Sequence, residues 1–105
     1  MTAAALIRAA RAAGITMKVD GERLVLSASE RPDDQLLEDL RREKPAIVAY
    51  LRYVAAWTKE DWQALFDERA GIMEYDGVLP RPMAEHHATA EVEALRHIVV
   101  EASVA

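Results

Sequence analysis

Histidine and glutamate side chains near the C-terminal end come nearest to a metal site in this sequence. His87 and Glu91 are four positions apart, so a helix would bring them to one face. Zinc takes three or four protein ligands. Glu85 and His86 are neighbours of this pair, but His97 lies too far along such a helix to join it. A polar helix face is the simpler interpretation, and we predict no metal site and no cofactor.

Carboxylates in the preceding segment could in principle perform acid–base chemistry, which commonly uses a pair of them. The four candidates are Asp67, Glu68, Glu74 and Asp76. The sequence offers them no nucleophile or metal partner, and salt bridges to Arg69 and Arg81 or simple solvation explain them. It also lacks a glycine-rich phosphate loop and a suggestive Ser, His and Asp arrangement. We therefore predict that the protein is not an enzyme.

Aromatic side chains are a third group that could bind a ligand, because aromatic rings stack on nucleic-acid bases. Tyr50, Tyr53 and Trp57 are spaced i, i+3, i+7, and Trp62 follows. They lack interleaved basic residues, and the chain has a net charge of −5, which argues against nucleic acid as a partner. We interpret Tyr50, Tyr53 and Trp57 as a core or dimer seam.

Composition limits the remaining classes of protein. The 105 residues suggest one domain, and 51% hydrophobic with 30% charged residues is typical of a globular protein. The chain has no cysteine, which excludes disulfides and thiolate metal sites. No segment approaches the roughly 18 apolar residues of a membrane span. We expect a cytoplasmic protein with no membrane partner.

A β-hairpin at residues 15–27 is the clearest strand signal. Apolar residues alternate with polar ones on both sides of Asp20-Gly21, a dipeptide typical of a type I′ turn. A two-residue loop at Asp20-Gly21 would pair Val19 with Glu22 and Lys18 with Arg23. The hairpin would then expose two unpaired edges and a basic outer face.

Helical signals occupy the rest of the chain. Caps, prolines and apolar stripes predict helices over residues 3–13, 32–42, 45–56, 59–75 and 83–100, with 101–105 as a fraying tail. Gly14 is suited to follow the first helix, and Gly77 the fourth, as left-handed residues. Gly71, inside the fourth helix, suggests a close helix crossing. The third helix is apolar on nearly all sides and is expected to be the centre of the fold.

Two segments carry a family resemblance: LIRAARAAGITMKVDGERLVLSA and LLEDLRREKPAIVAYLR. Their strongest points are Gly14, the Asp20-Gly21-x-x-Leu24 hairpin and Lys44-Pro45-x-Ile47. Over residues 4–52 the chain resembles the TubC N-terminal docking domain family of bacterial megasynthases. The resemblance implies an αββαα fold, a homodimer, and an exposed hairpin that binds the short acidic tail of a preceding subunit. Carried over by position, the peptide-binding residues are Thr16, Lys18, Arg23, Val25 and Ser27.

The second half of the chain differs from that family. No synthetase domain follows in these 105 residues. Instead, WTKEDWQALFDERAGIMEYDGVLPRPMAEHHA resembles a helical segment of small proteins associated with phage and plasmid genes. This similarity leaves an alternative function, a mobile-element accessory protein that acts on replication or host-defence machinery.

The predicted fold class is α+β and mainly helical. An αββαα docking-domain-like unit with a two-stranded antiparallel hairpin spans residues 1–57. Two further helices within residues 58–105 form an extension packed on that unit, giving a single compact domain. The predicted function is non-catalytic protein–protein interaction, with an acidic extended peptide bound at the hairpin.

Overall fold

A computed structural model describes residues 1–101 of the chain. The chain divides into two compact units. The first comprises Met1–Ala55 together with the segment from Ile98 onward, and the second is Ala56–His97. The second unit is therefore an insertion in the chain of the first. Residues 102–105 of the predicted tail lie outside the described part.

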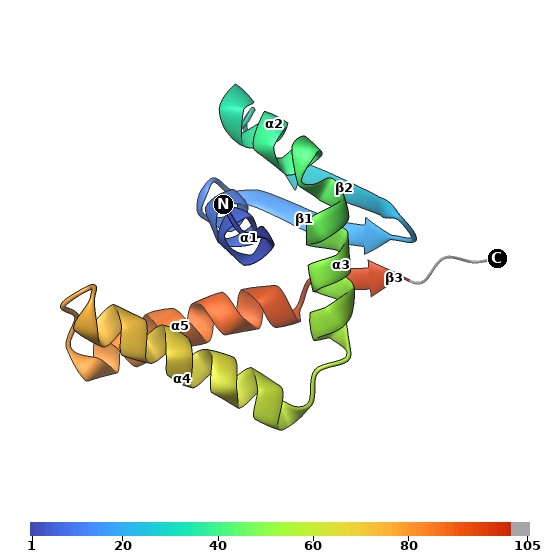
Figure 1. Cartoon of the computed structure of the whole chain (residues 1–105). Coiled ribbons are helices and arrows are strands. Elements are labelled where there is room, and N and C mark those ends of the chain that lie inside the picture. The colour runs from blue at the N-terminus through green and yellow to red at the C-terminus, as the bar shows by residue number, and fades with distance from the viewer. Residues whose placement is uncertain (102–105) are drawn as a thin grey trace. The chain divides into compact units, whose positions relative to one another are not determined.

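The first unit is a small sheet covered by helices (Figure 1). Its elements are α1 (Ala3–Ala12), β1 (Ile15–Asp20), β2 (Arg23–Ala28), α2 (Asp34–Arg42), α3 (Lys44–Ala55) and β3 (Val99–Glu101). The α+β, mainly helical class and the order α-β-β-α-α with two further helices are confirmed. The expected fifth helix, however, ends at Arg96 rather than at residue 100.

The core of the first unit forms where α3 packs on α1, α2 and the sheet. The largest fully buried side chains are Leu6, Val19, Leu40, Ile47 and Leu51. Because α3 presents Ile47, Val48, Leu51 and Val54 to this core, its nearly all-round apolar sequence is explained by contacts with several neighbours. The sheet buries the alternate residues Ile15 and Val19 of β1, so one of its faces is covered.

The hairpin turn differs from the predicted one. Asp20 pairs with Arg23, so the two-residue loop is Gly21-Glu22 rather than Asp20-Gly21. Gly21 has φ 63° and Glu22 has no positive φ, which is the pattern of a type II′ turn with glycine at its first position. The predicted register, with Lys18 opposite Arg23, is therefore wrong by two positions. A shift of two preserves the faces, because side chains alternate with a period of two.

β3 is an element that the sequence patterns did not predict. It pairs parallel to β1, with Lys18, Val19 and Asp20 opposite Val99, Val100 and Glu101. The strand order is β2-β1-β3, so β1 is the central strand (Figure 1). The expectation of two unpaired edges is therefore wrong for β1. Among residues 1–101, two edges of this sheet stay unpaired, the outer edge of β2 and that of the three-residue β3.

The second unit is a pair of helices, α4 (Lys59–Tyr75) and α5 (Arg81–Arg96), that pack on each other (Figure 1). Thr58 and Asp61 form the predicted capping box at the start of α4. Ala70, Ala84 and Ala88 are fully buried, and such small side chains let helices approach closely. Gly71 contributes nothing to a close approach, since a Cβ atom there would meet no atom within 4 Å. The predicted role of Gly71 at a helix crossing is therefore wrong.

The loop between α4 and α5 places an unexpected residue in the left-handed region. Val78 has φ 54°, whereas Gly77, the predicted left-handed residue, does not have a positive φ. Gly77 is required for a different reason: a Cβ atom there would lie 2.8 Å from the Met73 carbonyl oxygen. Positive φ in a β-branched residue is a genuine outlier, with a steric cost of about 1–2 kcal/mol.

Replacing Val78 with glycine is expected to stabilise the protein by about 1 kcal/mol. The substitution removes the steric cost of a branched side chain at positive φ. Part of the gain is offset because glycine has more freedom in the unfolded chain. Urea denaturation followed by circular dichroism measures the difference. A loss of stability would show that the valine side chain contributes more to the fold than its 84% exposure suggests.

Candidate functional site

The five residues predicted to bind a peptide lie on one face of the hairpin. Thr16 and Lys18 alternate with buried residues on β1, and Arg23, Val25 and Ser27 occupy the same face of β2. All are exposed except Lys18, which is half-buried. The Thr16 hydroxyl donates a hydrogen bond of 3.2 Å to the carbonyl oxygen of Ser27 across the strands. The structure thus brings together all five residues, and we call this surface the outer face.

The corrected register changes the electrostatics of the outer face. Lys18 is opposite Val25, and Arg23 is opposite Asp20. Directly opposed unlike charges are favourable and like charges unfavourable, by roughly 0.2–1 kcal/mol. The predicted repulsion between Lys18 and Arg23 is therefore absent. Within residues 1–101 the exposed Arg23 takes part in no ion pair, so its guanidinium keeps its donors for another partner.

The edge of β2 is the part of the site where a further strand could pair. In an antiparallel hairpin with a two-residue loop, the residues flanking the loop form a hydrogen-bonded pair, and the pairs then alternate. The pair Asp20 and Arg23 flanks the loop. By this alternation the backbone N–H and C=O groups of Leu24 and Leu26 face the open edge. They are donors and acceptors for an added strand.

Arg52 of α3 holds the hairpin turn and was missed by sequence reasoning. Its guanidinium donates a hydrogen bond to the Gly21 carbonyl oxygen, and Gly21 is buried. A charged donor strengthens a bond to a carbonyl and leaves no buried acceptor unsatisfied. The signal in the sequence was the presence of a single arginine within an otherwise apolar helix. This contact fixes the end of the sheet that carries Arg23.

A cleft of about 250 Å³ lies at the other end of β2, beside α2. Ile15, Leu26 and Leu37 contribute apolar side chains to it, and residues 27–32 form its rim. On this rim Arg31 donates a hydrogen bond of 2.8 Å to Asp34, and the Arg31 guanidinium lowers the pKa of the Asp34 carboxyl. The cleft therefore combines an apolar floor with a charged margin at the end of the open strand.

The predicted aromatic seam is divided between the two units. Tyr50 is half-buried and Tyr53 is 66% exposed, both on α3 of the first unit. Trp57 belongs to the second unit, where its ring packs edge-on against Trp62 with centroids 4.9 Å apart. The homodimer stays a prediction, and of these three residues Tyr53 has the largest exposed surface for a second copy.

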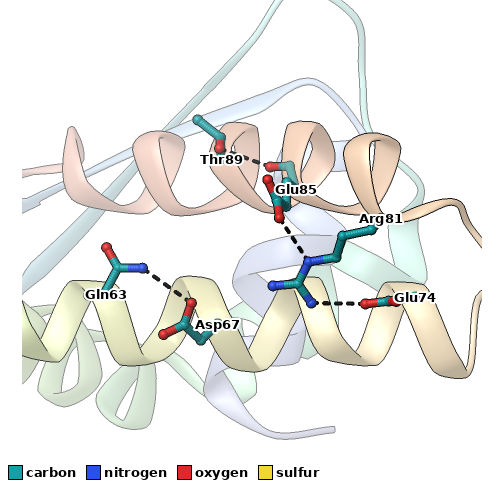
Figure 2. Close-up of polar contacts among 6 residues, drawn as sticks. All are labelled: Gln63, Asp67, Glu74, Arg81, Glu85 and Thr89. Atoms are coloured by element: carbon teal, nitrogen blue, oxygen red, sulfur yellow. Dashed lines mark hydrogen bonds and ion pairs between the residues drawn. The ribbon is translucent and has the colours of Figure 1, made fainter.

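Two of the four carboxylates considered for catalysis, Asp67 and Glu74, have polar partners within the second unit. Arg81 contacts Glu74 at 2.9 Å and Glu85 at 2.8 Å, and Gln63 donates to Asp67 at 3.2 Å (Figure 2). The two carboxylates raise the pKa of Arg81 further above its ordinary value. Of the salt bridges expected for these carboxylates, the one to Arg81 forms at Glu74, whereas Arg69 pairs with Glu91 instead.

Three of the residues considered for a metal site make other contacts within the second unit. Glu91 forms an ion pair with Arg69 at 2.8 Å, and the rings of His86 and His87 meet edge-on at 5.8 Å. In the part of the chain covering residues 1–101, no group of three or more His, Cys, Asp or Glu side chains is placed to hold a metal ion. Glu91 therefore has a structural partner in the helix pair.

No helix within residues 1–101 is long and apolar enough to cross a membrane. Comparison with known proteins identifies no relative: no family model matches the chain, and no match was found among curated proteins or solved structures. The assignment of function therefore depends on the geometry of the outer face and of the β2 edge.

Proposed function

We propose that the protein is a non-catalytic interaction module that binds an acidic extended peptide along β2. The open β2 edge carries this proposal, because it offers backbone groups beside the exposed side chains of Arg23 and Val25. Peptides commonly bind such an edge by adding a strand, with main-chain hydrogen bonds for affinity and side-chain contacts for specificity. Pairing of β1 with β3 supports β2, rather than β1, as the docking edge.

Each part of the site has a separate role in this proposal. The N–H and C=O groups of Leu24 and Leu26 pair with the peptide backbone. Arg23 pairs with an acidic side chain, since guanidinium groups match carboxylate geometry. The cleft lined by Leu26 and Leu37 receives an apolar side chain near the end of the peptide. This side chain would point to the covered side of the sheet.

Charge reversal at Arg23 is expected to weaken peptide binding by about tenfold, as for loss of one favourable ion pair. The probe is a fluorescent ten-residue peptide of alternating glutamate and valine, measured by fluorescence polarisation. Lys18→Glu added to Arg23→Glu should abolish binding. Lys18 already has interaction partners in the fold, so the single Arg23→Glu variant is the cleaner measurement.

Two controls separate this site from non-specific attraction. Arg11→Glu makes the same charge change at an exposed position of α1 and should leave the affinity unchanged. A peptide with every backbone amide N-methylated keeps its charge but has no backbone N–H to donate to the β2 edge. Unchanged binding by the double variant would exclude the outer face, and full binding of the methylated peptide would exclude strand addition.

A further inference from the structure

The end of the α4–α5 pair exposes an unusual group of large apolar side chains. Tyr75 is 81% exposed, Val78 84%, Met83 50% and Ile72 38%. They belong to the last turns of α4, the connecting loop and the first turn of α5. We call these four residues the helical tip. Single exposed apolar residues are ordinary, but a group of them at one end of an element is typical of an interaction surface.

Val78 gives the helical tip its second unusual property. The loop brings the Leu79 N–H to the Met73 carbonyl oxygen at 3.2 Å, with Val78 at φ 54°. Glycine would adopt this conformation without strain. Valine instead places a branched apolar side chain in the solvent at a steric cost. Strained residues of this kind cluster at binding and catalytic sites.

Ion pairs between α4 and α5 hold the two helices that carry the helical tip. Arg81 joins Glu74 of α4 to Glu85 of its own helix, as Figure 2 shows. Farther along, Arg69 joins Glu91 between the two helices, with both side chains about four-fifths buried. Because these ion pairs already fix the helices, binding a partner costs less conformational entropy, and this favours affinity.

The charge of the second unit indicates the chemistry of a partner. Residues 56–97 contain four Lys or Arg and nine Asp or Glu, so this unit carries a charge of −5, equal to that of the whole chain. Its arginines are already paired: Arg69 with Glu91, Arg81 with Glu74 and Glu85, and Arg96 with Glu93. Within the described residues Asp76, two positions before Val78, is exposed and has no ion pair.

We propose that the helical tip is a second protein-binding surface, which inserts Tyr75 and Val78 into an apolar pocket edged by lysine or arginine on a partner protein. Buried aromatic and aliphatic anchors supply most of the energy at such contacts. Complementary charge selects the partner and steers its approach. The proposal does not depend on the β2 edge, whose proposed ligand has the opposite charge. One chain would then join an acidic peptide to a basic protein.

Selection from a random twelve-residue peptide library displayed on phage tests this surface with a defined probe. The whole protein is immobilised, and enriched peptides are synthesised and measured by fluorescence polarisation. We expect one enriched class that combines Arg or Lys with Leu, Phe or Trp. Its affinity should fall at least tenfold with Val78→Asp and with Tyr75→Ala, and stay unchanged with Arg23→Glu.

Two further variants keep the test decisive. Val78→Gly removes the side chain without straining the loop, so weaker binding by this variant separates lost contact from misfolding. Ala90→Asp adds the same charge as Val78→Asp at an exposed position of α5 and should leave binding unchanged. Enrichment of acidic peptides alone, or of basic peptides that bind every variant equally, would overturn the proposal. So would a self-association that Val78→Asp abolishes in sedimentation velocity, because the tip would then bind a second copy.

Discussion

Truncation of Leu51 to alanine is expected to lower the free energy of unfolding by about 3 kcal/mol. Leu51 is fully buried on α3, the helix that contacts α1, α2 and the sheet. Deleting buried methyl groups removes their transfer free energy and leaves a cavity, which together cost about 2–5 kcal/mol. Urea denaturation followed by circular dichroism should show a lower midpoint with an unchanged slope, as for a change in stability alone.

The same truncation at Leu36 is the matched control. Leu36 is half-exposed on α2, so the substitution removes less buried surface and leaves no closed cavity. The free energy of unfolding is expected to fall by about 1 kcal/mol in this variant, because folding then buries less apolar surface. Equal losses at the two positions would contradict the assignment of α3 as the centre of the first unit.

Alanine at two glycines of the second unit is expected to change stability in opposite directions. Gly77→Ala should destabilise by about 1–3 kcal/mol, because its Cβ atom would lie 2.8 Å from a backbone oxygen that cannot move freely. Gly71→Ala should stabilise by about 1 kcal/mol, since alanine is the better helix former and its Cβ atom meets nothing within 4 Å. Thermal unfolding by circular dichroism should shift the midpoints apart, by roughly 4 °C or more per kcal/mol.

These glycine variants also test the geometry of the loop that presents Val78. If Gly77→Ala were neutral, the Met73 carbonyl would have to move aside and the left-handed position of Val78 would lose its support. If Gly71→Ala were destabilising, α4 would have a neighbour at that position, as a close crossing requires. Either result would revise the description of the helical tip.

Local signals in the sequence predicted both ends of α1 and the start of α4. Thr2 accepts a hydrogen bond of 3.1 Å from the Ala5 N–H, and Gly14 follows α1 with φ 79°. The capping box of Thr58 and Asp61 forms as expected. Such features depend on residues three or four positions apart, so they can be predicted from the sequence alone.

Contacts between distant parts of the chain could not be predicted in this way. β3 has only three residues, and its apolar residues continue the pattern of α5, so periodicity extended the helix over it. Pairing with β1 decides its structure. The hydrogen bond from Arg52 to Gly21 and the positive φ of Val78 likewise depend on the assembled fold. Tertiary context often overrides local preference in short segments.

The sequence predicted which hairpin residues share a face more accurately than it predicted which residues stand opposite each other. Thr16, Lys18, Arg23, Val25 and Ser27 share a face in both the expected and the observed register, since the two differ by two positions. Their neighbours differ, because turn type decides which residues stand opposite each other. Asp20-Gly21 favoured one turn, while the structure uses Gly21 at the first position of another.

Pairing of β3 with β1 has a consequence for the order of folding. Lys18 and Val99 are about 80 residues apart in the chain, whereas the β1–β2 hairpin closes through two loop residues. Contacts of high sequence separation form slowly, because a long loop must close before they gain any energy. A folded α4–α5 pair shortens that loop and so raises the effective concentration of the last strand at β1. β1 would therefore pair with β2 first and with β3 late. Until β3 has paired, the second edge of β1 is free, and another chain could compete for it.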